Sequence, residues 1–138
     1  MPENGRSVLV VEDDPEINEL VGAYVQIAGF EYESALNGTQ AVEKARSVHP
    51  ALIVLDVMLP DFDGFEVARR LKGESPTREI PIVMLTALDR EEYRQKGKTA
   101  GAVDYLTKPF DPDRLMDAIK DNALRNGDPA TRGGAARS

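Results

Sequence analysis

The chain has 138 residues, 41% hydrophobic and 30% charged, which is the balance of a single globular domain. No apolar run approaches the roughly 20 residues of a membrane-spanning helix and the N-terminus lacks a signal-peptide pattern, so no membrane role is expected. The net charge of −7 argues against direct nucleic-acid binding by this domain, and the absence of cysteine excludes thiol catalysis and fits a reducing cytoplasm.

Short apolar runs alternate with helical patterns along the whole chain. Strands are predicted at residues 8–11, 30–34, 52–56, 80–85 and 102–106. Helices are predicted from Asp14-Pro15 to Gly29, from Asn37-Gly38 to His49, from Phe65 to Gly73, over residues 89–100, and after Pro109. Gly64, just before the third helix, is interpreted as a residue that permits a tight turn. The fourth helix is polar, with little apolar face.

This alternation predicts an α/β domain with five βα units. The strands are almost continuously apolar, which is typical of a parallel sheet covered by helices on both faces. Right-handed crossovers then favour a doubly wound five-stranded sheet, with the flavodoxin-like strand order 2-1-3-4-5. The domain is predicted to span residues 6–125. Residues 126–138 are rich in Gly, Ala and Arg and are predicted to be a disordered tail or the start of a linker.

Polar side chains stand at the ends of four predicted strands. Asp56 follows the run from Ala51 to Leu55, and Asp13-Asp14, Thr86 and Lys108 follow other apolar runs. Because the carboxyl ends of parallel strands meet at one edge of a sheet, these groups are expected to lie together. Acids, a hydroxyl and an amine at one edge predict a phosphoryl-transfer site.

The residue types suit that chemistry. A carboxylate such as that of Asp56 can attack phosphorus and form an aspartyl phosphate. Clustered carboxylates repel one another unless a cation joins them, and Mg²⁺ prefers such hard oxygen ligands. The amine of Lys108 offers a point charge for phosphoryl oxygens, and Thr86 offers a hydroxyl donor. Asp13-Asp14 alone would more simply be a helix cap.

With these residues in place, the chain resembles the receiver domain of two-component response regulators. The resemblance covers roughly residues 6–125. The motifs that carry it are Val10-Val11-Glu12-Asp13-Asp14, Leu55-Asp56-Val57-Met58-Leu59-Pro60 with Asp63-Gly64, Leu85-Thr86-Ala87, and Asp104-Tyr105-Leu106-Thr107-Lys108-Pro109-Phe110. They occur in order and at predicted strand ends, and together they are far more specific than any one alone.

The resemblance implies a role for each acid. Asp56 would be the phosphoacceptor, in a reaction that depends on Mg²⁺. Asp14 would ligate the metal directly, Asp13 largely through water, and the backbone carbonyl of Met58 would supply a further ligand. A domain of this kind catalyses only its own phosphorylation and dephosphorylation, so no metabolic enzyme is expected.

The resemblance also implies how the signal leaves the site. Thr86 and Lys108 would bind the phosphoryl group, and Tyr105 would be the switch aromatic whose side chain follows Thr86. The face built from the fourth helix, the fifth strand and the last helix would then change. The partners implied are a histidine kinase or phosphotransfer protein and a downstream protein target, with a phosphorylation-dependent homodimer left open. Apolar side chains at Met58 and Leu88 predict a long-lived phosphoryl group.

Three other functions compete with this interpretation. A phosphatase of the haloacid dehalogenase type would need a second acid two residues after the nucleophile, where this chain has Met58. A flavodoxin-type electron carrier would need a hydroxyl- and glycine-rich loop after the first strand, where Glu12-Asp13-Asp14 would repel phosphate. A receiver-like interaction domain that takes no phosphate remains the third alternative.

Overall fold

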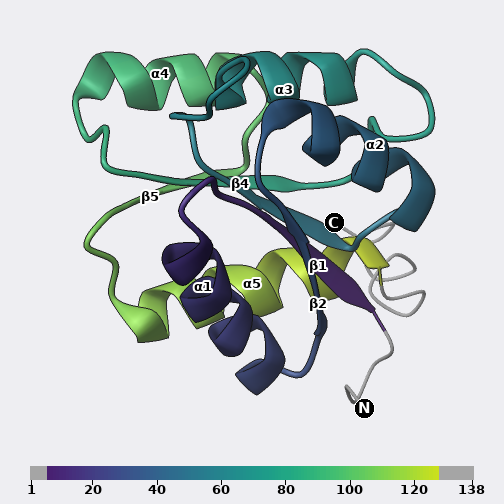
Figure 1. Ribbon diagram of the computed structural model, residues 1–138, viewed down its shortest axis with the longest axis vertical. Helices are drawn as coiled ribbons and strands as arrows, with labels where there is room; N and C mark the ends of the chain where they lie inside the picture. The colour runs from purple at the N-terminus through teal and green to yellow at the C-terminus, as the bar shows by residue number, and fades with distance from the viewer. Residues whose placement is uncertain (1–5, 128–138) are drawn as a thin grey trace.

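The computed structural model describes residues 6–127, which form a parallel sheet of five strands flanked by five helices (Figure 1). The strands are β1 (Ser7–Val11), β2 (Glu31–Ala35), β3 (Leu52–Leu55), β4 (Ile82–Thr86) and β5 (Asp104–Thr107). The helices are α1 (Pro15–Ile27), α2 (Gly38–Val48), α3 (Gly64–Lys72), α4 (Glu91–Thr99) and α5 (Pro112–Gly127). The strand order is β2-β1-β3-β4-β5, with every neighbouring pair parallel, which confirms the predicted fold.

Helices cover both faces of the sheet, with α1 and α5 on one face and α2, α3 and α4 on the other (Figure 1). Along β1, Val8 and Val10 pack into the core beneath α1 and α5, whereas Leu9 and Val11 pack into the opposite core. This alternation follows from the two-residue repeat of a strand, and it explains why the strands are apolar on both faces. Within residues 6–127, no helix is both long enough and apolar enough to cross a membrane.

Element boundaries differ from the predictions by a few residues. The fourth strand begins and ends later than predicted, so that Thr86 is its last residue, and the fifth strand runs to Thr107. The last helix continues through Asn126 and Gly127, two residues that had been assigned to the tail. The predicted disorder of the remaining tail, residues 128–138, lies outside the described residues.

The loop after β3 is tied to the start of α2 by the carboxylate of Asp61. Its oxygens accept hydrogen bonds from the backbone N–H of Gly38 (2.7 Å) and of Thr39 (2.9 Å), from the Thr39 hydroxyl (2.8 Å), and from the backbone N–H of Phe62 (2.8 Å). Desolvation raises the pKa of Asp61, but these hydrogen bonds outweigh it and lower the pKa well below its ordinary value. The charged form therefore stabilises the fold.

We expect Asp61→Asn to lower the free energy of unfolding at pH 7 by about 1 kcal/mol, the usual size of a helix N-cap. The folded-state pKa lies below the unfolded value of about 3.9, so this contribution is complete above that pH and is lost as the pH falls further. Urea unfolding of both proteins at pH 7, 5 and 3 should show a difference that is equal at pH 7 and 5 and smaller at pH 3. A difference that stays constant to pH 3 would contradict the role of the charge.

Candidate functional site

The predicted site residues gather at the carboxyl edge of the sheet. Asp56 follows β3, Thr86 ends β4 and Lys108 follows β5. Backbone hydrogen bonds hold these ends together, from the Asp56 N–H to the Val11 carbonyl (3.0 Å) and from the Lys108 N–H to the Thr86 carbonyl (2.9 Å). The sheet, rather than the loops alone, therefore fixes where each functional side chain begins.

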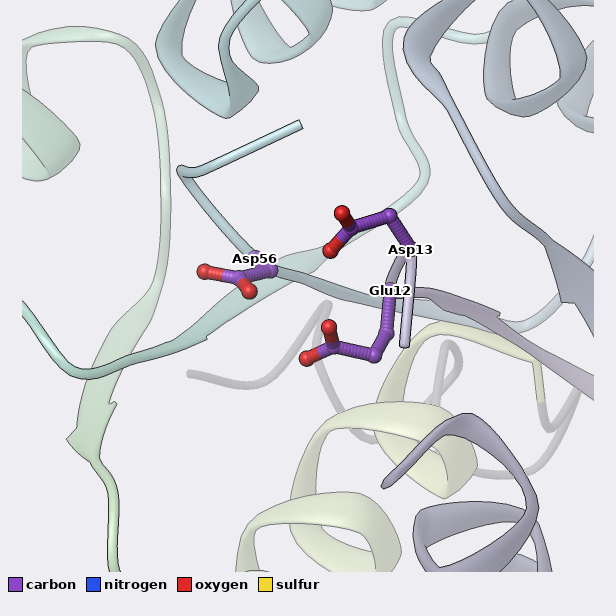
Figure 2. A group of neighbouring side chains, drawn as sticks. All are labelled: Glu12, Asp13 and Asp56. Carbon is purple, nitrogen blue, oxygen red and sulfur yellow. The ribbon is translucent and has the colours of Figure 1, made fainter. Parts of the chain in front are cut away.

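Three carboxylates meet at this edge. Oxygens of Glu12, Asp13 and Asp56 lie within 4.8 Å of one another, and Glu12 and Asp56 are buried while Asp13 is exposed. Figure 2 shows them reaching the same place from the ends of β1 and β3. Such a group of hard oxygen donors, open to solvent on the Asp13 side, is suited to a divalent cation.

Lys108 bridges the two buried acids. Its Nζ donates to Asp56 Oδ2 at 3.0 Å and also donates to Glu12 Oε1. Burial raises the pKa of Glu12 to about 7; the hydrogen bond from Lys108 opposes this rise, and the nearby charge of Asp56 adds to it. Burial lowers the pKa of Lys108, but Glu12 and Asp56 outweigh that effect and raise it above the ordinary value, so the amine stays charged.

Asp14 caps a helix in the structure, and its predicted role as a direct metal ligand stays a prediction. Asp14 Oδ1 accepts hydrogen bonds from the backbone N–H groups of Glu16 (2.9 Å) and Ile17 (3.4 Å), so this side chain caps α1. The acid that joins Asp13 and Asp56 is instead Glu12, which the sequence analysis did not single out. The start of α1 engages the Asp14 carboxylate as its capping acceptor, and Asp14 is not among the acids grouped with Asp56.

The register of the sheet explains the position of Glu12. Val11 of β1 pairs with Leu55 of β3, and Glu12 and Asp56 are the residues that directly follow this pair. Equivalent positions on neighbouring parallel strands lie side by side, so the first residue after each strand is the one to compare. Of the three consecutive acids, Glu12 is the one that directly follows β1, and it therefore lies beside Asp56.

Thr86 and Tyr105 both contact the backbone of Leu88. Thr86 is fully buried, and its Oγ1 accepts a hydrogen bond from the Leu88 N–H at 3.4 Å. The Tyr105 hydroxyl donates to the Leu88 carbonyl at 2.5 Å, and the Arg94 guanidinium lies 5.2 Å from the centre of the Tyr105 ring. The loop after β4 thus connects the buried hydroxyl with the aromatic ring, although the switch role itself stays a prediction.

Met58 lies at the mouth of the site. Its backbone N–H donates to Asp56 Oδ1 at 3.2 Å, and Met58 is 58% exposed. The predicted contribution of its carbonyl to a metal stays a prediction. Met58 is therefore both in contact with Asp56 and open to solvent.

Comparison with known proteins decides the family. The family model for the response regulator receiver domain matches residues 8–120. The chain belongs to this family. Among curated relatives, this receiver domain is 40% identical over 113 residues to the DNA-binding dual master transcriptional regulator RpaA of a Synechocystis strain. It is 42% identical over 123 residues to the phosphate regulon transcriptional regulatory protein PhoB of Pseudomonas aeruginosa.

These two alignments cover 82% and 89% of this chain but only 47% and 54% of the relatives, so the chain spans about half of their length. Solved receiver structures match nearly end to end. The chemotaxis protein CheY4 of Vibrio cholerae has a TM-score of 0.80 at 35% identity, covering 86% of this chain and 98% of that one. The receiver domain of the sensor histidine kinase PA1611 from Pseudomonas aeruginosa has a TM-score of 0.79 at 30% identity, with coverage of 86% and 98%.

Membership of the receiver family favours a signalling role over the phosphatase and electron-carrier alternatives. The PA1611 receiver was solved with a magnesium ion coordinated in its active-site cleft. In the present receiver domain, the acids that could serve such an ion are Glu12, Asp13 and Asp56.

Proposed function

We propose that this receiver domain is a Mg²⁺-dependent switch that accepts a phosphoryl group on Asp56. The observation that carries the proposal is the environment of this carboxylate. Asp56 is only 6% exposed, yet it lies at the carboxyl edge of the sheet beside two other acids and within hydrogen-bond distance of the Lys108 amine. A buried acid in this setting is typical of a functional site, whereas most acids of a protein lie on its surface and keep it soluble.

The donor set fits Mg²⁺. The ion would be held by carboxylate oxygens of Glu12, Asp13 and Asp56, with the Met58 carbonyl as a further ligand. Two of the acids are buried and share a single lysine. One amine neutralises only part of the charge of the acids, so the group still attracts a divalent cation. When bound, Mg²⁺ supplies neutralisation of the charge on the phosphoryl oxygens.

Asp56, Lys108 and Thr86 would each have a separate role in the transfer. An oxygen of Asp56 attacks phosphorus, forming the acyl phosphate bond while the bond from phosphorus to the donor histidine nitrogen breaks. The Lys108 ammonium, 3.0 Å from Asp56 Oδ2, is placed to stabilise the phosphoryl oxygens. Thr86, at the end of the neighbouring strand β4, would hydrogen-bond the group after transfer.

Output would pass through the face formed by α4, β5 and α5. A phosphoryl group adds roughly −1.5 to −2 of charge, which can draw Thr86 inward and so displace the Leu88 backbone that Tyr105 contacts. The partners we propose are a histidine kinase or phosphotransfer protein upstream and a protein target downstream, in the cytoplasm. DNA binding in longer relatives is not proposed for this acidic domain.

Phosphorylation with acetyl phosphate tests the proposal. Incubation with MgCl₂ should add roughly 80 Da, the mass of one phosphoryl group, as measured by intact mass spectrometry. The addition should be lost with EDTA and in Asp56→Ala, and it should persist in Asp117→Ala, which removes an exposed acid of α5. An unmodified wild type under these conditions would favour the alternative of an interaction domain that takes no phosphate.

Met58→Asn is expected to shorten the lifetime of the phosphoryl group. The thioether can neither orient nor deprotonate water, whereas an amide can orient it without taking a proton. We therefore expect phosphate loss to accelerate by about threefold to tenfold, less than the roughly hundredfold of a full general base. Loss should be followed by intact mass after removal of acetyl phosphate, with Met58→Leu as the apolar control. Equal rates in the asparagine variant and the wild type would rule out the predicted protection by Met58.

A further inference from the structure

Asn18, on α1, is a buried polar side chain that lies behind the acidic group. It is 1% exposed, and its Nδ2 lies within hydrogen-bond distance of three backbone carbonyls: Glu12 at 3.0 Å, Ala35 at 3.1 Å and Val10 at 3.3 Å. Two of these carbonyls belong to β1 and the residue after it, and the third ends β2. The amide therefore joins the ends of two strands at the point where the chain turns toward the site.

We propose that Asn18 is a positioning residue for the divalent cation, because it fixes the turn from which Glu12 and Asp13 project. This inference rests on the proposed function, in which these acids bind Mg²⁺. Asn18 acts through the Glu12 carbonyl and not through contact with the phosphoryl group. A turn held in one conformation presents the two carboxylates together, so that binding need not first order them.

The orientation of the Asn18 amide is itself set by Tyr32 of β2. The Tyr32 hydroxyl donates to Asn18 Oδ1, which leaves Nδ2 facing the three carbonyls. Gly22, one turn further along α1, makes room for the tyrosine, since a Cβ at this position would lie 2.5 Å from the ring. Helix α1, strand β2 and the turn after β1 are thus joined through one amide.

The backbone around Glu12 is held from a second side as well. The Glu12 N–H donates to the Ala35 carbonyl at 3.1 Å, and the Asp14 N–H donates to Glu12 Oε2 at 3.1 Å. Without Asn18, the Glu12 carbonyl would lose the side-chain donor that the structure gives it, at a site closed to most water. We expect the turn to move in response, because a buried carbonyl without a donor is costly.

Calorimetric titration with MgCl₂ tests the inference on the folded protein. Asn18→Ala should raise the Kd for Mg²⁺ by about tenfold, the lower end of what loss of a ligand-orienting residue costs. Thr77→Val is the matched control. Thr77 is also fully buried and donates from its hydroxyl to the Leu71 carbonyl (2.7 Å), but it follows α3 and precedes β4, near the opposite edge of the sheet. Its Kd should equal that of the wild type, although both variants are less stable.

Tyr32→Phe provides a milder variant that keeps the ring and removes only the hydroxyl; its Kd should rise, by less than the roughly tenfold expected for Asn18→Ala. If Asn18→Ala does not fold, this variant decides the question. Unchanged affinity in the folded variants, or equal weakening in Thr77→Val, would overturn the role of Asn18 while leaving the proposed function intact. A wild type that does not bind Mg²⁺ would overturn both.

Discussion

Lys108→Met is expected to slow phosphorylation of Asp56 by at least about a hundredfold, the usual cost of removing one donor that stabilises a transition state. The Lys108 Nζ lies 3.0 Å from Asp56 Oδ2, and the lysine side chain is only 17% exposed, so solvent screens its charge poorly. Methionine keeps much of the shape of the side chain and removes the charge. The loss therefore reports on electrostatics at the phosphoryl group.

The same substitution should tighten Mg²⁺ binding when it is measured at a pH above the pKa of Glu12, which loss of the Lys108 hydrogen bond raises further. Lys108 neutralises part of the charge of Glu12 and Asp56, and it therefore repels an arriving cation. Two unit charges 4 Å apart interact by about 4 kcal/mol at an effective dielectric constant of 20, and we expect about 1.4 kcal/mol of this, or tenfold, to appear in the Kd. A slower reaction together with tighter binding would separate the lysine from the residues that hold the metal.

Intact mass spectrometry over time with acetyl phosphate gives the rate, and calorimetry gives the Kd. Lys72→Met is the control, because Lys72 is also a partly buried lysine. Its amine donates to the carbonyls of Arg78 (3.0 Å) and Ile80 (2.8 Å), in the segment between α3 and β4. This control should change neither quantity. An unchanged rate in Lys108→Met would contradict the proposed role. Weaker Mg²⁺ binding would show instead that Lys108 holds the acids in place.

Gly64→Ala should lower the free energy of unfolding by about 2 kcal/mol or more. An added Cβ at Gly64 would lie 2.3 Å from the Asp56 carbonyl oxygen and 2.9 Å from the Val57 Cα. Both are backbone atoms of the site, which cannot rotate away as a side chain could. Gly64 also donates from its N–H to the Val57 carbonyl at 2.8 Å, so that the start of α3 is held against the loop after β3.

Urea unfolding measures this loss, with Gly73→Ala as the matched control. A Cβ at Gly73, which follows α3, would come no closer than 3.3 Å to the Arg69 carbonyl, and we expect a change within about 0.5 kcal/mol. Similar stability of Gly64→Ala and the wild type would show that α3 can shift without cost. In that case the rate of Asp56 phosphorylation becomes the more sensitive measure of the displacement.

The Gly64 contact adds a physical reason to the sequence interpretation of this residue. Gly64 is predicted to permit a tight turn, and it is not among the described glycines with positive φ, which are Gly29 and Gly101. Glycine is needed at position 64 because helix and loop backbones approach closely. A sequence shows that a glycine is present before a helix, but the reason for it depends on which backbone atoms lie opposite.

The arrangement of the elements was predictable because hydrophobic periodicity is local. Runs such as Leu52–Leu55 are apolar on both faces, and this pattern has few solutions other than a parallel sheet between two layers of helices. Asp56, Thr86 and Lys108 could be grouped for the same reason, since parallel strands deliver their carboxyl ends to one edge. The chain order of strands and polar residues sufficed for this, without any knowledge of side-chain contacts.

The tertiary structure alone decided which acids face one another. Glu12, Asp13 and Asp14 are consecutive, and their sequence does not show that the first joins Asp56 and Lys108 while the third caps α1. That choice depends on the register of β1 against β3 and on the direction in which α1 leaves the sheet, both set by packing between distant segments. The sequence by itself thus determined the sheet and the chemistry available at its edge, whereas long-range packing determined which carboxylates carry it out.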